Sequence, residues 1–179
     1  MRQHHWPTTI AFIAAICGLI LGTLPAGAQT IDILALGASN TYGKGVSRQQ
    51  AYPRHLQNML RARGLKARVR NAGINGNTTG RMRARLRGAL RPTTRLVILQ
   101  PGGNDRRRGI SRSTRRANIQ FMKSYLRQRG IAVVMLPNRL IGAVARHHPR
   151  PDGQHFLGNG YRALAARLVP RVLQAIPRR

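Results

Sequence analysis

Strand-like and helix-like patterns alternate along this sequence, and that alternation restricts the possible folds more than any other feature. Short apolar runs bounded by glycine or polar residues alternate with segments that carry apolar residues at helical spacing. The predicted strands are 31–36, 67–70, 95–100 and 131–136, and the predicted helices are about 48–63, 82–90, 113–128 and 158–175. This order predicts an α/β fold, a three-layer α/β/α sandwich around a parallel central sheet.

Three polar, glycine-containing turns follow the first three predicted strands. They comprise residues 37–40, 71–79 and 101–105. The functional crevice of an open parallel sheet lies outside the carboxyl ends of its strands, so we expect these turns to share one edge. The segment 137–151 is expected to be a short connection that leaves the site open, and it leads to Asp152 and His155 before the last helix.

Serine, histidine and aspartate side chains are available for nucleophilic catalysis near this edge. A serine hydroxyl is a weak nucleophile until a base takes its proton, and the base needs a carboxylate to hold its tautomer. Ser39 follows the first strand, and Asp152 precedes His155 by three residues. Each residue also has an ordinary alternative: Ser39 and Asn104 as turn residues, Asp152 as a helix cap, and His155 as a surface residue.

Four sequence blocks, in the same order, resemble those of the SGNH, or GDSL-type, hydrolases. They are Gly37-Ala-Ser39, the segment from Asn71 to Thr79, Gly102-Gly-Asn104-Asp, and Asp152-Gly-Gln-His155. The resemblance covers essentially the whole chain after residue 28 and is closest to bacterial esterases, arylesterases, lysophospholipases and thioesterases. It implies a flavodoxin-like fold and hydrolysis of acyl esters through an acyl-enzyme, without metal or organic cofactor. Aryl esters, lysophospholipids, acyl thioesters and acetylated sugars are alternative substrates.

The resemblance also implies a role for each matching residue. Ser39 matches the nucleophile, His155 the general base, and Asp152 the acid that orients the base. The oxyanion hole would consist of the backbone N–H groups of Ser39 and Gly76 and the side-chain amide of Asn104. Removing one donor of such a hole typically costs about 2.7–4 kcal/mol of transition-state stabilisation.

The nucleophile block departs from the family pattern. The usual Gly-Asp-Ser-Leu reads Gly37-Ala38-Ser39-Asn40 in this chain, so the carboxylate expected to brace the turn is missing. This departure favours a second hypothesis. The chain would then be a non-catalytic exported binding protein on a hydrolase scaffold, with arginines that hold anionic polysaccharide or a membrane surface.

The N-terminal segment has the three parts of a secretory signal peptide. Arg2 lies in a charged region, an apolar stretch covers residues 10–24, and Pro25-Ala-Gly-Ala28 provides a cleavage site. The apolar stretch is shorter than the roughly 20 residues that span a bilayer. We therefore expect residues 1–28 to be removed together with Cys17, and residues 29–179 to form a secreted or periplasmic hydrolase domain. An uncleaved membrane anchor is the alternative.

A net charge of +29 results from 32 Lys and Arg residues and only three acids. Such a charge first indicates a nucleic-acid or anionic-membrane partner. However, the arginines are spread along the chain, and aromatic residues make up only 4%, too few for a base-stacking surface. We therefore expect a small-molecule or lipid ester as substrate, non-specific binding to anionic surfaces and no specific nucleic-acid binding. No metal site is expected, because adjacent His147 and His148 rarely share one ion.

Overall fold

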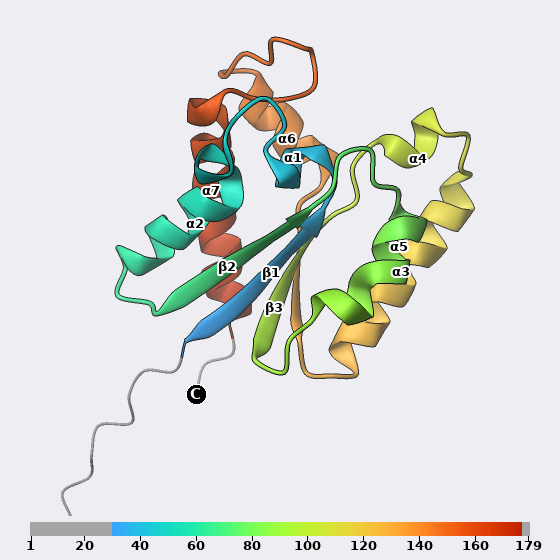
Figure 1. Ribbon diagram of the computed structural model, residues 1–179, viewed down its shortest axis with the longest axis horizontal. Helices are drawn as coiled ribbons and strands as arrows, with labels where there is room; N and C mark the ends of the chain where they lie inside the picture. Colours follow the sequence, from blue (N-terminus) through green and yellow to red (C-terminus); the bar gives the residue numbers. More distant parts are fainter. Residues whose placement is uncertain (1–29, 177–179) are drawn as a thin grey trace, which may run out of the picture.

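The predicted strands form one parallel sheet in a computed structural model of the chain, which describes residues 30–176 (Figure 1). The proposed signal peptide lies outside the described residues, so it stays a prediction. In chain order the strands are β1 (Ile31–Gly37), β2 (Ala67–Gly73), β3 (Thr94–Gln100) and β4 (Ala132–Met135). Their order across the sheet is β2-β1-β3-β4, and each neighbouring pair is parallel.

Helices cover both faces of this sheet, which confirms the predicted α/β/α sandwich. Figure 1 shows α2 (Tyr52–Arg61) and α7 (Gly158–Ala175) on one face, and α3 (Thr79–Ala89) and α5 (Arg112–Arg127) on the other. The shorter helices are α1 (Ser39–Tyr42), the 3-10 helix η1 (Arg48–Gln50), α4 (Asn104–Arg107) and α6 (Asn138–Ala145). Among residues 30–176, no helix has both the length and the apolar character needed to cross a membrane.

Strand β1 is buried on both faces because it lies inside the sheet. Ile33 and Ala35 pack into the core beneath α2 and α7, whereas Leu34 and Leu36 pack into the core beneath α3 and α5. Successive side chains of a strand point to opposite faces, so a strand covered on both sides is continuously apolar. Full burial of each such large aliphatic side chain contributes about 1.5–3 kcal/mol to folding.

Two predicted segments differ from the structure. The helix expected over 48–63 is divided into η1 and α2, and Pro53 lies in the first turn of α2, where a missing N–H costs nothing. The expectation that 137–151 is only a short connection was wrong, because this segment contains α6. Ile141 and Val144 of that helix are buried in the core beneath α7.

A buried ion pair lies at the amino edge of the sheet. The Asp32 carboxylate is 3.3 Å from Arg70 Nε and also accepts hydrogen bonds from the hydroxyls of Thr93 and Thr94. Arg70 donates a further bond to the Ala89 carbonyl. The pair thus ties β1 to β2 and to the loop before β3, at the edge opposite the turns that follow the strands.

We expect Asp32→Ala to lower the free energy of unfolding by about 3 kcal/mol, because it leaves the Arg70 charge largely buried without a carboxylate. Urea unfolding monitored by circular dichroism should show a lower midpoint with an unchanged slope. Asp32→Asn, which keeps an acceptor oxygen, is the matched control and should lower the free energy of unfolding by less. An unchanged midpoint for the alanine variant would contradict this role of the pair.

Candidate active site

Ser39 lies at the carboxyl edge of the sheet, two residues after β1 and at the start of α1. Close backbone packing puts it there, because α1 crosses the ends of β1 and β2. A Cβ added to Gly37 would lie 2.1 Å from the Thr41 hydroxyl oxygen, and one added to Gly73 would lie 2.1 Å from the Tyr42 nitrogen. Only glycine at both strand ends allows the turn that carries Ser39 to approach this closely.

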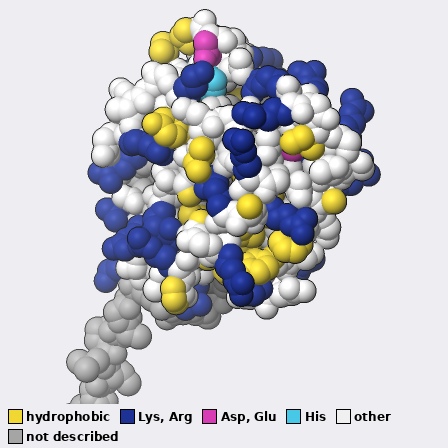
Figure 2. All heavy atoms as spheres, turned by 45° about the vertical axis from the view of Figure 1, so that its right-hand side comes forward, with side chains coloured by type: hydrophobic (Ala, Val, Ile, Leu, Met, Phe, Trp, Pro, Cys, Tyr) yellow, Lys and Arg dark blue, Asp and Glu magenta, His cyan; other side chains and the backbone are white. Residues whose placement is uncertain are grey.

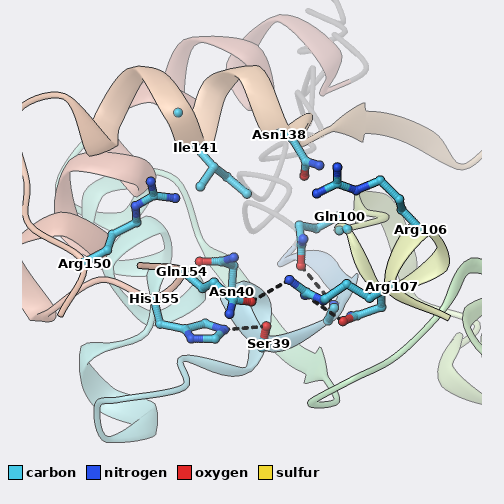
Figure 3. Close-up of a pocket in the computed structure, with 15 residues that line it drawn as sticks. Ser39, Asn40, Gln100, Arg106, Arg107, Asn138, Ile141, Arg150, Gln154 and His155 are labelled. Atoms are coloured by element: carbon cyan, nitrogen blue, oxygen red, sulfur yellow. Dashed lines mark hydrogen bonds between the residues drawn. The ribbon is translucent and has the colours of Figure 1, made fainter. Parts of the chain in front are cut away.

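Ser39, His155 and Asp152 form one hydrogen-bonded line. The Ser39 Oγ is 2.7 Å from His155 Nε2, and His155 Nδ1 is 2.5 Å from Asp152 Oδ2 (Figure 3 shows the Ser39–His155 contact). Both Ser39 and His155 are buried. Residues that lie 116 positions apart in the chain are therefore in direct contact.

The Asp152 carboxylate is held by more than the imidazole. Its other oxygen accepts hydrogen bonds from the backbone N–H groups of Gln154 at 2.9 Å and His155 at 2.7 Å. The bond with the His155 ring, and then these two N–H groups, keep the pKa of Asp152 well below its usual range. The carboxylate is thus ionised and correctly placed to orient the imidazole.

The alternative roles considered for these residues do not match their positions. Helix α7 begins at Gly158, and its N-cap is Leu157, so Asp152 does not cap the helix and His155 does not lie in its first turn. His155 is also only 5% exposed. Both residues belong to the loop that precedes α7.

Asn104 lies at the start of α4 and lines the same cavity as Ser39. Its side-chain nitrogen donates a hydrogen bond to the Asn77 carbonyl at 2.9 Å, and its side-chain oxygen accepts one from Arg107 at 2.9 Å. These two bonds determine which way the amide faces. The amide nitrogen keeps a second N–H that is not used by Asn77.

Gly76 lies in the turn after β2, next to Asn77, and has a φ of +69°, a conformation that favours glycine. It is not among the residues that line the cavity around Ser39. The N–H groups of Ser39 and Gly76 form no hydrogen bond with other residues in the range 30–176. The structure thus brings Asn104 to Ser39, and the role of Gly76 as a donor stays a prediction.

Gln100, which the sequence did not point to, braces the turn that carries Ser39. Its side-chain oxygen accepts hydrogen bonds from the Ala38 N–H at 2.9 Å and from the Thr41 hydroxyl at 3.1 Å. Gln100 is the last residue of β3 and pairs with Gly37 of β1. The sequence does show a polar residue at the end of an apolar strand. However, the hydrogen-bond partners of Gln100 follow only from the register between β1 and β3.

Asp105 braces the neighbouring turns. It is fully buried, and its carboxylate accepts hydrogen bonds from both the N–H and the hydroxyl of Thr79. Asn118 of α5 donates to the same hydroxyl. Because Thr79 starts α3 and Asp105 lies in α4, this contact ties the turn that contains Gly76 to the turn that contains Asn104.

The cavity beside Ser39 has a volume of about 240 Å³. Figure 3 shows His155 and Ser39 on one side, and Asn138 and Ile141 of α6 on the other. Three arginines, Arg106, Arg107 and Arg150, also line it. Within residues 30–176, no three His, Cys, Asp or Glu side chains are grouped so that they could hold a metal ion.

Comparisons with known proteins show the family to which this chain is similar. Residues 35–175 match the GDSL-like lipase/acylhydrolase family. The chain is 33% identical over 125 residues to the esterase TesA of Pseudomonas aeruginosa, covering 69% of this chain and 61% of that protein. It is also 33% identical over 119 residues to an arylesterase of Vibrio mimicus, covering 65% of this chain and 60% of the relative.

The chain therefore spans about three-fifths of the length of the curated relatives that it matches. The crystal structure of AlinE4, an esterase of the SGNH-hydrolase family, is similar in fold. Its TM-score is 0.62 at 27% identity, and the match covers 84% of this chain and 98% of that chain.

We expect Gln100→Met to slow the labelling of Ser39 by a fluorophosphonate probe about 10- to 100-fold, because a displaced nucleophile loses its alignment. The matched control is Gln57→Met, which also removes a buried side-chain acceptor, here from the Val69 N–H, but lies on α2. Both variants should be less stable, by about 1–3 kcal/mol for each donor left unpaired. Equal labelling rates for the two variants would show that Gln100 does not position the serine.

Proposed function

The chain belongs to the GDSL-like lipase/acylhydrolase family, and from this membership and the site geometry we propose that it hydrolyses carboxylic esters through an acyl-enzyme. The observation that carries the proposal is the line from Asp152 through His155 to Ser39, with contacts of 2.5 and 2.7 Å. A base within hydrogen-bond reach of a serine, itself oriented by a carboxylate, is the arrangement that activates a hydroxyl.

In the proposed mechanism, the Ser39 Oγ attacks the ester carbonyl carbon while His155 Nε2 takes the hydroxyl proton. The Asp152 carboxylate keeps the proton on Nδ1 and stabilises the imidazolium. Collapse of the tetrahedral intermediate breaks the bond to the leaving oxygen, which receives the proton from His155. Water then attacks the acyl-Ser39 ester with His155 as base, releasing the acid and restoring the hydroxyl.

The oxyanion would be stabilised by the Ser39 and Gly76 N–H groups and by the Asn104 amide. Asn104 is held by Asn77 and Arg107 before any substrate binds, so little reorganisation is needed as charge develops. The bond from Gln100 to the Ala38 N–H supplies the brace that the altered nucleophile block otherwise lacks. It therefore supports catalysis over the alternative of a non-catalytic binding protein.

The walls of two adjoining cavities favour an acyl ester as substrate. A second cavity of about 590 Å³ shares Arg106 and Asn138 with the cavity beside Ser39. Its apolar lining includes Ile110, Ile119 and Met135. We propose that a short acyl group binds beside Ser39, and that a longer one extends into the second cavity. Aryl esters are the first substrates to test, since one of the relatives is an arylesterase.

Replacing Ser39 with Ala should abolish turnover of p-nitrophenyl acetate and butyrate, lowering kcat by about four orders of magnitude or more. Without the hydroxyl no acyl-enzyme forms, and labelling by a fluorophosphonate should also be lost. Ser47→Ala, at an exposed serine in the loop before η1, is the matched control and should retain both properties. Undiminished turnover in a folded Ser39→Ala variant would refute the proposal.

The pH profile of kcat/KM is expected to fall on the acid side with a slope of one. Only His155 must lose a proton to act as base, because the pKa of Asp152 lies well below its usual range and this carboxylate stays ionised. Because the pKa of Asp152 is lower in the folded chain than in the unfolded one, its ionised form also stabilises the fold. This contribution is fully present above the ordinary pKa of aspartate and is lost as the pH falls below it. A slope of two would mean that a second group, such as Asp152, is protonated in the same range.

A further inference from the structure

We propose that Arg106 and Arg150 form an anion-binding subsite beside Ser39, so that the preferred ester carries a carboxylate or phosphate group. The proposal rests on the proposed ester hydrolysis at Ser39 and adds the charge of the substrate to it. A guanidinium presents five N–H donors in a planar fork that matches the oxygens of both anions.

Both arginines line the same cavity as Ser39 and His155. Figure 3 shows them on opposite sides of this cavity, with Ile141 between them and the reacting groups below. They come from separate segments, because Arg106 lies in α4 and Arg150 lies in the loop before Asp152. An ester bound at Ser39 therefore has a guanidinium on either side.

No carboxylate within residues 30–176 neutralises these two charges. The sequence holds only three acids, and each is used elsewhere: Asp32 pairs with Arg70, Asp105 bonds to Thr79, and Asp152 bonds to His155. Within the same residues, neither Arg106 nor Arg150 side chain donates a hydrogen bond. Both guanidinium groups thus retain their full donor capacity for an anion.

Arg107 differs from Arg106 and Arg150 because its guanidinium already donates hydrogen bonds to other side chains. It donates to the side-chain oxygens of Gln154 at 2.6 Å and Asn104 at 2.9 Å. It therefore adds a fixed positive charge beside the expected oxyanion position, and positions the Asn104 amide rather than binding the substrate anion. The Arg106 and Arg150 groups are the ones free to bind it.

The cationic lining extends into the second cavity, which Arg106 shares. Arg112, Arg115 and Arg116 also line that cavity around its apolar residues. Figure 2 shows Lys and Arg side chains over the face in view, with very few acidic ones among them. This arrangement suits an amphiphilic ester with an apolar chain and an anionic group, and either a carboxylate or a phosphate would meet the same donors.

Two matched substrate pairs test the proposal. Mono-p-nitrophenyl adipate is compared with p-nitrophenyl hexanoate, and monooctanoylglycerol phosphate with monooctanoylglycerol, so that the carboxylate and the phosphate are tested separately. We expect kcat/KM to favour the anionic member of at least one pair by about tenfold or more. The pair that shows the preference identifies the anion.

In the variant Arg106→Gln with Arg150→Gln, the ratio of kcat/KM for the anionic ester to kcat/KM for its neutral partner should fall about tenfold. Arg167→Gln with Arg171→Gln, at two exposed arginines of α7, removes the same two charges and is the matched control for overall charge. This control should keep the preference for the anionic ester, because two charges outside both cavities alter the local field little. Arg150→Lys keeps the positive charge and should therefore keep part of the preference for the anionic ester.

The outcomes separate this proposal from the proposed function. Equal or faster hydrolysis of the neutral esters by the natural protein would overturn the anion subsite while leaving ester hydrolysis intact. A preference that persists in the double glutamine variant would also overturn it, since the overall charge would then be the cause. Failure to hydrolyse any of the four esters would instead count against the function of Ser39.

Discussion

The parallel register of the central sheet is the constraint on which the site depends. Gly37 at the end of β1 pairs with Gly73 of β2 and with Gln100 of β3, so three strands end at one level. The turns after these strands are therefore neighbours, although they are separated by dozens of residues in the chain. Since the backbone hydrogen bonds of the sheet set this level, the site lies on a rigid edge.

Buried hydrogen bonds then convert neighbouring turns into a defined geometry. Gln100 holds the turn that carries Ser39, Asp105 links the two following turns, and Asp152 holds the His155 imidazole. The hydrogen bonds of Gln100 and Asp105 stabilise the fold more here than at an exposed position, because a buried donor left unpaired cannot turn to water instead. Asp152 is itself exposed, and the imidazole that it holds is buried. All three side-chain carboxylates of the sequence serve structural or orienting contacts, so no acidic side chain between residues 30 and 176 compensates the positive charge around the cavity.

Most of the fold and part of the site could be predicted from sequence, for different reasons. The apolar run of β1 and the helical spacing in α7 encode burial directly, so strand and helix positions were largely correct. Helix α6 was missed because it is short and has no capping side chain at its N-terminus. Gln100 was missed because its partners, in the turn after β1, lie more than fifty residues away in the chain.

The sequence by itself determined the layer order and the family, and it singled out Ser39, Asp152 and His155 as candidates, because local patterns and motif blocks carry that information. Only the tertiary structure decided that Ser39 and His155 touch, that Gln100 accepts a hydrogen bond from Ala38, and that Arg106 and Arg150 line the same cavity. Distances between segments far apart in the chain depend on sheet register and on core packing. Those are collective properties of the folded chain, which no local pattern specifies.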